Sequence, residues 1–196
     1  MSWFKRSKEG ITTSTKDKKE TPEGLWSKCS RCKTVFTAQD LEKNAWVCDR
    51  CSNHERIGSE QYFYLLFDEG KYVEINEKVT SGDPLDFVDT KKYTDRIKAT
   101  QKATGLKDAI RTAYGDLNGF PFVVAAMDFS FVGGSMGSVM GEKIARAIDK
   151  AIELKAPFMI ISKSGGARMM EAAFSLMQMA KTSAKLALLA QAGLPY

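Results

Sequence analysis

The sequence predicts an α/β fold preceded by a small metal-binding module. Between residues 110 and 193, apolar strand-like runs alternate with glycine-rich loops and helix-like segments, which is typical of α/β domains whose crossovers share one hand. All four cysteines fall within residues 29–51, ahead of those runs. A chain of 196 residues is long enough for one full domain and one small module.

Composition narrows the class of protein only a little. The chain is 43% hydrophobic and carries a net charge of +5, which mildly favours acidic partners such as CoA, nucleic acid or an anionic protein. No run approaches the roughly 18 apolar residues of a membrane helix. Residues 1–24 lack the apolar core of a secretion signal and read as a flexible basic tail. We therefore expect a cytoplasmic protein with no membrane partner.

The cysteine spacing is the most specific signal in the chain. Cys29 and Cys32 form one C-x2-C pair, and Cys48 and Cys51 form a second pair fifteen residues later. Two such pairs supply four thiolates at about 2.3 Å from a tetrahedral Zn²⁺. Four protein ligands leave no open position for water, so we expect one structural zinc ion. Residues 25–56 are predicted to form a zinc ribbon that needs its metal to fold.

Disulfide and redox roles for these cysteines are less well supported by the sequence than metal binding. Disulfides require an oxidising compartment, and a redox pair requires a βαβ context that is absent here. His54 is expected to be a surface bystander, because four cysteines already suffice. The predicted short-strand residues of the ribbon are Val35, Phe36, Trp46 and Val47. Its basic residues leave a nucleic-acid-binding role open, and these are Lys28, Arg31, Lys33, Arg50 and Arg56.

Residues 57–108 are expected to form connecting helices and loops. A helix is predicted over residues 59–69, with Ser59 at its start and Gly70 as its stop. Residues 71–75 alternate like a strand, and residues 81–87 are rich in turn formers. Residues 90–105 predict a mostly polar helix at the surface or against a partner, with Tyr93 and Ile97 on one side of it.

Residues 109–196 contain the α/β pattern itself. Asn118-Gly119 is a hairpin turn signal, and the continuous apolar run over residues 122–127 suits a strand buried on both faces. A helix over residues 138–155 and a short buried strand over residues 157–162 follow. Residues 164–193 predict a long, mostly buried helix whose methionines fill a core or a subunit interface.

Two glycine-rich loops, residues 133–137 and 164–168, each follow a strand and precede a helix. Neither matches a P-loop or a dinucleotide fingerprint. Parallel strands would bring both loops to one rim, where open peptide N–H groups stabilise an oxyanion. Arg168 is expected to pair with a phosphate, or else to brace a neighbouring loop. Glu171 suits the first turn of its own helix rather than acid catalysis.

The missing residue types restrict the possible chemistry. His54 is the only histidine, so no Ser/His/Asp set is available, and the cysteines are assigned to the metal. If the chain belongs to an enzyme, its chemistry should depend on backbone donors and on groups of the substrate.

The motifs "CSRC…CDRC", "DPLDFVDTKKYTDR", "FVGGSMGSVMGEK", "SGGARMMEA" and "SLMQMAKTSA" together resemble the β subunit family of bacterial acetyl-CoA carboxylase carboxyltransferase. The resemblance covers residues 25–196. It implies a crotonase-like (ClpP/crotonase) ββα superhelix core, partial in this chain, behind an N-terminal four-cysteine zinc ribbon. The implied reaction transfers a carboxyl group from carboxybiotin to acetyl-CoA and forms malonyl-CoA, the first committed step of fatty acid biosynthesis.

The resemblance also implies partners and site residues. The partners are a carboxyltransferase α subunit in an α2β2 heterotetramer, a biotin carboxyl carrier protein and biotin carboxylase, in a complex that binds nucleotide and ATP. Backbone amides would stabilise the thioester enolate, and biotin freed by decarboxylation would take the methyl proton. The zinc ligands would be Cys29, Cys32, Cys48 and Cys51. The catalytic backbone would come from Gly165, Gly166 and Ala167. The CoA side would be formed by Gly133, Gly134, Ser135, Gly137 and Arg168.

The chain ends on "LLAQAGLPY", where a helix stops and a new strand should begin. We therefore expect an N-terminal fragment, truncated at Tyr196, that lacks a later Gly-Gly loop of the family and is inactive alone.

Two other functions stay open at this point. One is a zinc-ribbon nucleic-acid-binding protein, which leaves the glycine loops unexplained. The other is a crotonase-type hydratase, which usually needs two acidic residues, whereas only Glu171 is near and Glu142 is poorly placed.

Overall fold

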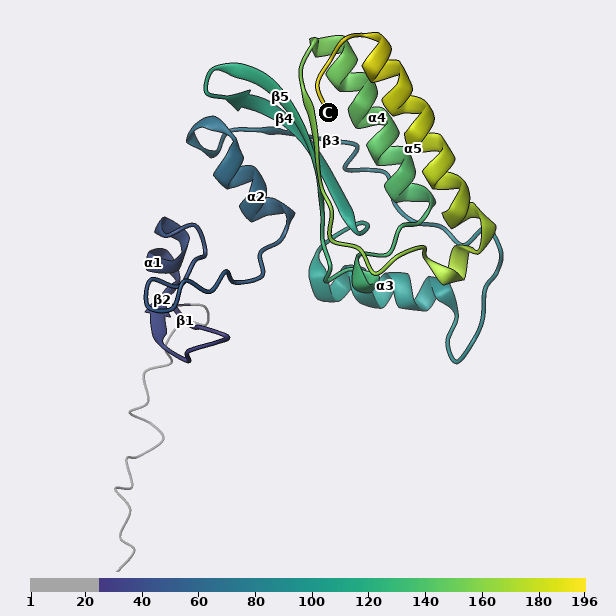
Figure 1. The fold of residues 1–196 in the computed structure, drawn as a ribbon. Coiled ribbons are helices and arrows are strands. Elements are labelled where there is room, and N and C mark those ends of the chain that lie inside the picture. The colour runs from purple at the N-terminus through teal and green to yellow at the C-terminus, as the bar shows by residue number, and fades with distance from the viewer. Residues whose placement is uncertain (1–24) are drawn as a thin grey trace, which may run out of the picture. The chain divides into compact units, whose positions relative to one another are not determined.

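The computed structural model describes residues 25–196, so the expected basic tail over residues 1–24 lies outside the described residues. The chain forms two compact units, of which the first ends at Arg56 and the second spans Ile57–Tyr196 (Figure 1). Within residues 25–196, no helix combines the length and the apolar character that crossing a membrane requires.

The first unit is small and has almost no apolar interior. Strand β1 (Trp26–Lys28) pairs antiparallel with β2 (Val35–Thr37), and helix α1 (Ala38–Lys43) follows directly. The Thr37 hydroxyl caps α1 by accepting the Asp40 N–H at 3.1 Å. Among the described residues of this unit, only Cys29 and Cys48 are buried.

The sequence-based prediction for this unit was correct in part. Val35 and Phe36 lie in a strand as expected. Trp46 instead lies in a turn with φ of 57°, and Val47 makes only an isolated bridge with His54. The helix α1 was not anticipated, because the stretch between the cysteine pairs is too short to show a helical period clearly.

The second unit is built on a four-stranded mixed sheet in the order β3-β4-β5-β6. The first three strands are antiparallel neighbours, whereas β5 and β6 run parallel. The strand bounds are Val73–Ile75 for β3, Ile110–Leu117 for β4, Phe120–Met127 for β5 and Phe158–Ile161 for β6. Asn118 and Gly119 turn the β4–β5 hairpin with φ of 52° and 77°, as predicted from the sequence.

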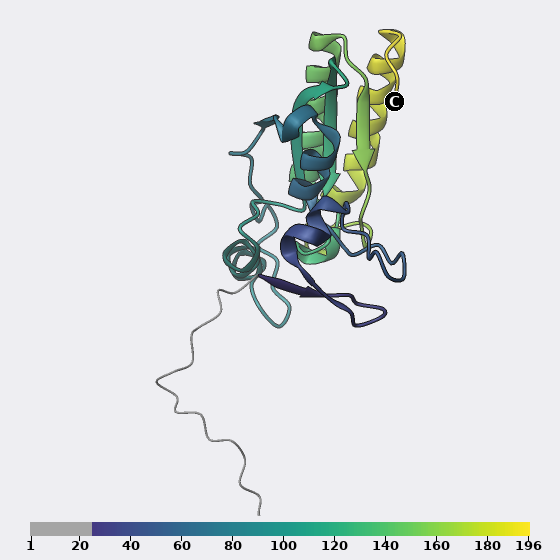
Figure 2. The ribbon, with the colours of Figure 1, turned by 90° about the vertical axis from the view of Figure 1, so that its left-hand side faces the viewer.

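Helices cover both faces of this sheet. Helices α4 (Ser138–Leu154) and α5 (Ala173–Gln191) lie on one side, with α4 next to the strands, and α2 (Ser59–Leu66) lies on the other (Figures 1 and 2). One apolar cluster joins β4 and β5 to α4, and a second joins them to Phe63 and Phe67. The remaining helix is α3 (Tyr93–Thr104), and short 3-10 turns span Asp68–Gly70, Val132–Gly134 and Met169–Glu171.

Because helices cover both of its faces, β5 is buried from Val123 to Met127, as the continuous apolar run predicted. β6 departs from the prediction of a fully buried strand. It is an edge strand in the described sheet, and although Phe158 is buried, Met159 is 36% exposed. An apolar run of four residues does not reveal whether a neighbouring strand covers it.

The long last helix also departs from prediction. It begins at Ala173 rather than at the glycine loop, and only Ser175, Gln178 and Leu189 are buried. Met177 and Met179 are 62% and 56% exposed, so they do not fill the core of this chain.

Two smaller expectations change as well. The first helix of the unit ends at Leu66 and is preceded by Gly58 as its N-terminal cap. Tyr93 and Ile97 of α3 face inward and are buried with Met170.

Candidate functional site

The four cysteines of the first unit converge on one point. Their sulfur atoms all lie within 4.8 Å of one another, with 3.7 Å between Cys29 and Cys51 and 3.6 Å between Cys32 and Cys48. A disulfide would need about 2.05 Å, and all four thiols are free. A tetrahedron with metal–sulfur bonds of about 2.3 Å has edges of about 3.8 Å. The cluster therefore fits a closed four-ligand metal site with no position left for a substrate.

The surroundings of the cysteines suit metal binding. The hydroxyl and peptide groups of Thr34 lower the pKa of Cys32 to about 6, whereas burial raises the pKa of Cys51 to about 12. A metal ion would displace the remaining thiol protons, because thiolates are the ligands. His54 is exposed and lies outside the cluster, as expected.

Sequence reasoning missed a contact that joins the two cysteine pairs. The Glu55 carboxylate accepts the Ser30 N–H at 2.9 Å and the Asn53 side-chain amide at 2.9 Å. Ser30 belongs to the first pair and Asn53 follows the second, so Glu55 fixes their separation. The Ser30 N–H lowers the pKa of Glu55, which keeps the carboxylate ionised. No spacing rule predicts such a contact, since it spans 25 residues.

The two glycine loops of the second unit meet at one rim, as the parallel arrangement predicted. Met136 and Ala167 form a parallel bridge, in which the Met136 N–H donates to Gly166 O and the Arg168 N–H donates to Met136 O, both at 2.8 Å. The Gly165 N–H donates to Gly133 O at 2.9 Å. The loops therefore extend the pairing of β5 and β6 past the ends of these strands.

Most of the bare backbone in the first loop allows close packing. A Cβ at Gly134 would lie 2.0 Å from Lys163 O, and one at Gly137 would lie 2.6 Å from a Glu171 carboxylate oxygen. Gly133 and Gly166 differ, because added Cβ atoms there would meet nothing within 4 Å, and both have positive φ. These two glycines leave backbone open to an approaching molecule.

The predicted oxyanion donors are not equivalent. Gly165 donates its N–H within the loop pair, and Gly166 donates to the exposed Ser164 hydroxyl at 3.0 Å. The Ala167 N–H donates to no acceptor among residues 25–196, and Ala167 is exposed. A donor that is free in the resting protein is available to a developing negative charge without first breaking a bond.

Arg168 occupies the centre of a buried polar network. Its guanidinium donates to both Asp108 carboxylate oxygens at 2.9 Å and to Ser135 O at 2.8 Å. Burial lowers the pKa of Arg168, but the hydrogen bonds and charge of Asp108 outweigh this and raise it, so the side chain stays charged. The side chain is 0% exposed. The side chain is thus closed to solvent and braces the first glycine loop, which is the second of the two roles expected for Arg168.

The same network supplies a carboxylate that caps the N-terminus of α4. The buried Glu171 carboxylate accepts the Ser138 N–H at 2.6 Å and the Tyr93 hydroxyl at 2.7 Å. Burial raises the pKa of Tyr93, so its phenol stays protonated and donates. Glu171 was expected to favour the dipole of its own helix, but it neutralises that of α4. A phosphate at this helix end would have to displace Glu171, which agrees with the failed P-loop pattern.

Several members of this network carried no sequence signal for a shared role. Ser81 lies in the loop after β3, Tyr93 at the start of α3 and Asp108 in the loop after α3. The Ser81 hydroxyl accepts a hydrogen bond from Arg168 at 2.9 Å. Asp108 directly precedes an apolar strand, which marks it as unusual but does not identify its partner. These residues position the loops and do not themselves face an open site.

Comparison with known proteins places the chain in a family. Residues 66–196 match the carboxyl transferase domain. The acetyl-coenzyme A carboxylase carboxyl transferase subunits beta of Pedobacter heparinus and Christiangramia forsetii are each 61% identical over the whole chain, which spans 70% and 68% of their lengths.

Solved structures agree on the fold. A transcarboxylase 12S structure with hydrolysed methylmalonyl-coenzyme A bound matches 69% of this chain and 24% of its own, with a TM-score of 0.57 and 23% identity. A Pseudomonas malonate decarboxylase hetero-tetramer in complex with malonate matches 67% of this chain and 46% of its own, with a TM-score of 0.51 and 27% identity.

The fold neighbours and the clustered cysteines confirm the predicted α/β, crotonase-like class with a cysteine ribbon. Since the alignment with these relatives covers the whole chain at 61% identity, this protein belongs to the carboxyl transferases, in the acetyl-coenzyme A carboxylase carboxyl transferase subunit beta family.

Proposed function

We propose that this chain is the β component of a carboxyltransferase that moves the carboxyl group of carboxybiotin to acetyl-CoA and forms malonyl-CoA, in the first committed step of fatty acid biosynthesis. Family membership supports the reaction class. The observation that carries the proposal is the joined pair of glycine loops, which presents the open backbone of Gly133, Gly166 and Ala167 at one rim.

The reaction requires the acetyl methyl group to lose a proton and become an enolate, whose negative charge collects on the thioester oxygen. We assign the Ala167 and Gly166 N–H groups as its donors. Ala167 is already free, and Gly166 holds only the exposed Ser164 hydroxyl, which can rotate away. Gly165 supports the loop from within. Biotin freed by decarboxylation takes the proton, so no side-chain base is needed.

The CoA side of the site divides into contact and support. Gly133 offers open backbone beside the thioester and is assigned to contact CoA. Gly134, Ser135 and Gly137 hold the loop against Lys163, Arg168 and Glu171. Arg168 acts as a positioning residue through Ser135. Glu171 occupies the N-terminus of α4, so this helix end is closed to a nucleotide phosphate. We therefore propose nucleotide and ATP binding for the whole complex rather than for this helix end.

The metal of the first unit is proposed to be Zn²⁺. Four sulfur ligands in a closed tetrahedral arrangement favour zinc, and a site without an open position is structural. The four free thiols also favour a reducing compartment, so we propose that the protein acts in the cytoplasm.

The proposed partners are a carboxyltransferase α subunit in an α2β2 heterotetramer, a biotin carboxyl carrier protein and biotin carboxylase. The exposed apolar face of α5 supports a subunit interface, because a monomer rarely leaves so many large apolar side chains in water. Its members are Phe174, Leu176, Met177, Met179 and Leu188, each at least 46% exposed.

A carboxyl-transfer assay tests the assignment of Ala167. A form of the chain extended past Tyr196 is assembled with an α subunit and a biotin carrier, and malonyl-CoA formation is measured for wild type, Ala167→Pro and Ala167→Ser. Proline removes the N–H, and we expect kcat to fall by about 10²–10³-fold, whereas serine keeps the donor and most of the rate. Equal rates for the proline and serine variants, with unchanged melting temperatures, would refute the assignment. The expected inactivity of the 196-residue chain, which would lack the later Gly-Gly loop, is checked by comparing it with the extended form in the same assay.

A second candidate function is nucleic-acid binding by the cysteine unit. The observation that favours it is that Lys28, Arg31, Lys33 and Arg50 are all exposed on this small unit. A gel shift with and without metal, over a range of salt concentrations, separates the two functions. Metal-dependent binding that weakens steeply with salt would support this role. Absence of binding at low salt would exclude a nucleic-acid-binding role for this unit.

A further inference from the structure

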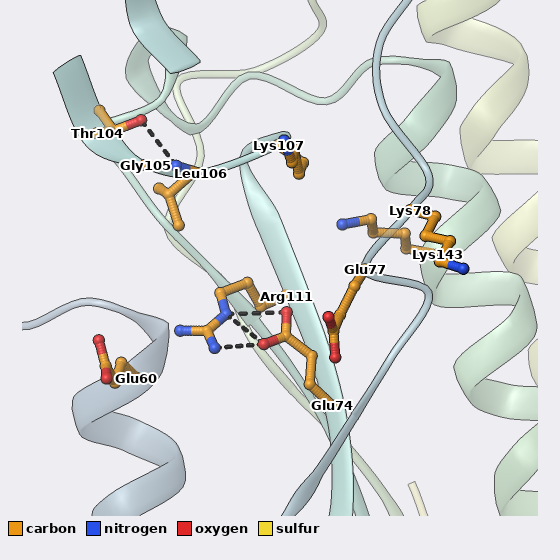
Figure 3. A pocket seen from close by; sticks show the side chains of 10 residues that line it. All are labelled: Glu60, Glu74, Glu77, Lys78, Thr104, Gly105, Leu106, Lys107, Arg111 and Lys143. Atoms are coloured by element: carbon orange, nitrogen blue, oxygen red, sulfur yellow. Dashed lines mark hydrogen bonds and ion pairs between the residues drawn. The ribbon is translucent and has the colours of Figure 1, made fainter. Parts of the chain in front are cut away.

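A pocket of roughly 530 Å³ lies in the second unit, apart from the glycine loops. It is bounded by the start of α2, the end of β3, the loop after α3 and the first turns of α4 (Figure 3). Its volume falls in the range typical of small-molecule sites. The lining residues are Glu60, Glu74, Glu77, Lys78, Thr104, Gly105, Leu106, Lys107, Arg111 and Lys143.

The unusual member of the lining is Lys143 on α4, which is only 2% exposed. Its ammonium group donates to Ile110 O at 3.3 Å, and no carboxylate among the described residues lies close enough to form an ion pair with it. An ammonium group carries three protons, so two of them have no acceptor among residues 25–196. Burial lowers the pKa of Lys143, and the negative charges of Asp108, Glu74 and Glu77 oppose this only in part. Asp108 is itself bound by Arg168. A buried cation in this state is destabilising unless an anion joins it.

No other charged side chain of the pocket forms an ion pair with Lys143, and the carboxylates whose charge reaches it from the pocket are either bound to another cation or exposed. Glu74 is already bound to Arg111, whose Nε lies 3.0 Å from both of its carboxylate oxygens. Glu60 and Glu77 are exposed, as are Lys78 and Lys107. In Figure 3, Glu60 lies on the far side of the pocket from Lys143. The lining holds four cationic and three acidic side chains, which leaves one positive charge in excess.

We propose that this pocket binds a small organic monocarboxylate whose carboxylate group accepts hydrogen bonds from Lys143 Nζ. A single negative charge matches the single excess positive charge. A phosphate dianion would exceed it and would be repelled by the neighbouring glutamates. The site goes beyond the proposed carboxyl transfer, since none of the glycine-loop residues lines the pocket.

Acetate serves as the probe in thermal unfolding of the whole chain. The melting temperature is measured in sodium acetate and in sodium chloride of equal ionic strength, in a buffer without carboxylate or phosphate. We expect acetate to raise the melting temperature of the wild type in a saturable manner, since a ligand that binds only the folded state stabilises it. Lys143→Met should abolish this rise. The control Lys150→Met, on the same helix but paired with Glu153, should keep it.

Two further arms make the result decisive. Lys143→Met should melt no lower than wild type in chloride, because methionine replaces an unpaired buried charge with an apolar chain of similar length. Glu77→Gln, at an exposed position, removes one negative charge from the pocket. It should lower several-fold the acetate concentration that gives half of the rise in melting temperature. This measurement does not depend on whether the lysine variant folds. Equal acetate effects in wild type and Lys143→Met, or no change with Glu77→Gln, would overturn the proposal. A larger Lys143-dependent effect of inorganic phosphate would refute the monocarboxylate class.

Discussion

The two units of this chain are stabilised by different interactions. In residues 25–56 the only buried side chains are two cysteines, whereas Ile57–Tyr196 buries apolar clusters on both faces of one sheet. We therefore expect the small unit to need a metal held by its four sulfur atoms, whereas the larger unit is held by its own apolar core. Within the larger unit, the glycine loops rest on a buried network of charges around Arg168 rather than on apolar packing. Because the metal site, the apolar core and the polar network stabilise different parts of the chain, disrupting each of them should lower stability by a different amount.

Removal of the proposed metal should have the largest effect. Structural zinc contributes apparent binding energies of about 10–16 kcal/mol in small modules, so chelation or Cys48→Ser should unfold residues 25–56. The Ile57–Tyr196 unit should keep its own thermal transition, because its core contains no cysteine. Hydrogen exchange resolved by segment measures both. His54→Ala is the control and should change neither. A single transition that takes both units together would contradict the comparison.

Loss of the buried cation should rank next. Arg168→Met leaves Asp108 and Glu171 buried without their partner, and we expect the free energy of unfolding to fall by about 3–5 kcal/mol. Arg146→Met removes an exposed partner of Glu142 and should cost less than about 1 kcal/mol. Urea denaturation of both variants gives the two values. Similar losses would mean that the network does not hold the loops.

The two neighbouring glycines of the first loop provide a matched pair. Both Gly133 and Gly134 have positive φ, so alanine strains each by about 1 kcal/mol. Only at Gly134 would the new Cβ meet Lys163 O, at 2.0 Å, and overpacking should add about 1–3 kcal/mol. Equilibrium unfolding should therefore show a larger loss of stability for Gly134→Ala than for Gly133→Ala, and the difference measures the cost of the steric contact apart from backbone strain. If Gly133→Ala is the more destabilising variant, the close approach of the loops is not what requires glycine.

The smallest effect concerns alkaline pH. Burial raises the pKa of Tyr93 in the folded chain above its unfolded value of about 10. Its contribution is therefore present below pH 10 and is lost as pH rises toward the folded pKa, since the unfolded state releases its proton first. Tyr93→Phe should flatten the loss of stability between about pH 10 and 11, measured by urea titration at each pH.

The sequence predicted the local features well because neighbouring residues carry them. The spacing within each C-x2-C pair indicated metal ligands, Asn118-Gly119 adopts the positive φ of a tight hairpin, and residues 122–127 are apolar enough for a strand covered on both faces. The order of strand, loop and helix placed both glycine loops on one rim. In each case the deciding interactions lie within a few residues or follow from strand direction.

Tertiary structure decided which partner each charged group takes and which faces stay open. Glu171 caps α4 rather than its own helix, and Arg168 binds Asp108, 60 residues away, rather than a phosphate. The apolar period of α5 indicated a helix but not what would cover it, and its methionines are exposed. A one-dimensional pattern records how apolar a residue is. Burial and pairing depend on neighbours that the fold brings from distant segments, so only the assembled structure defines them.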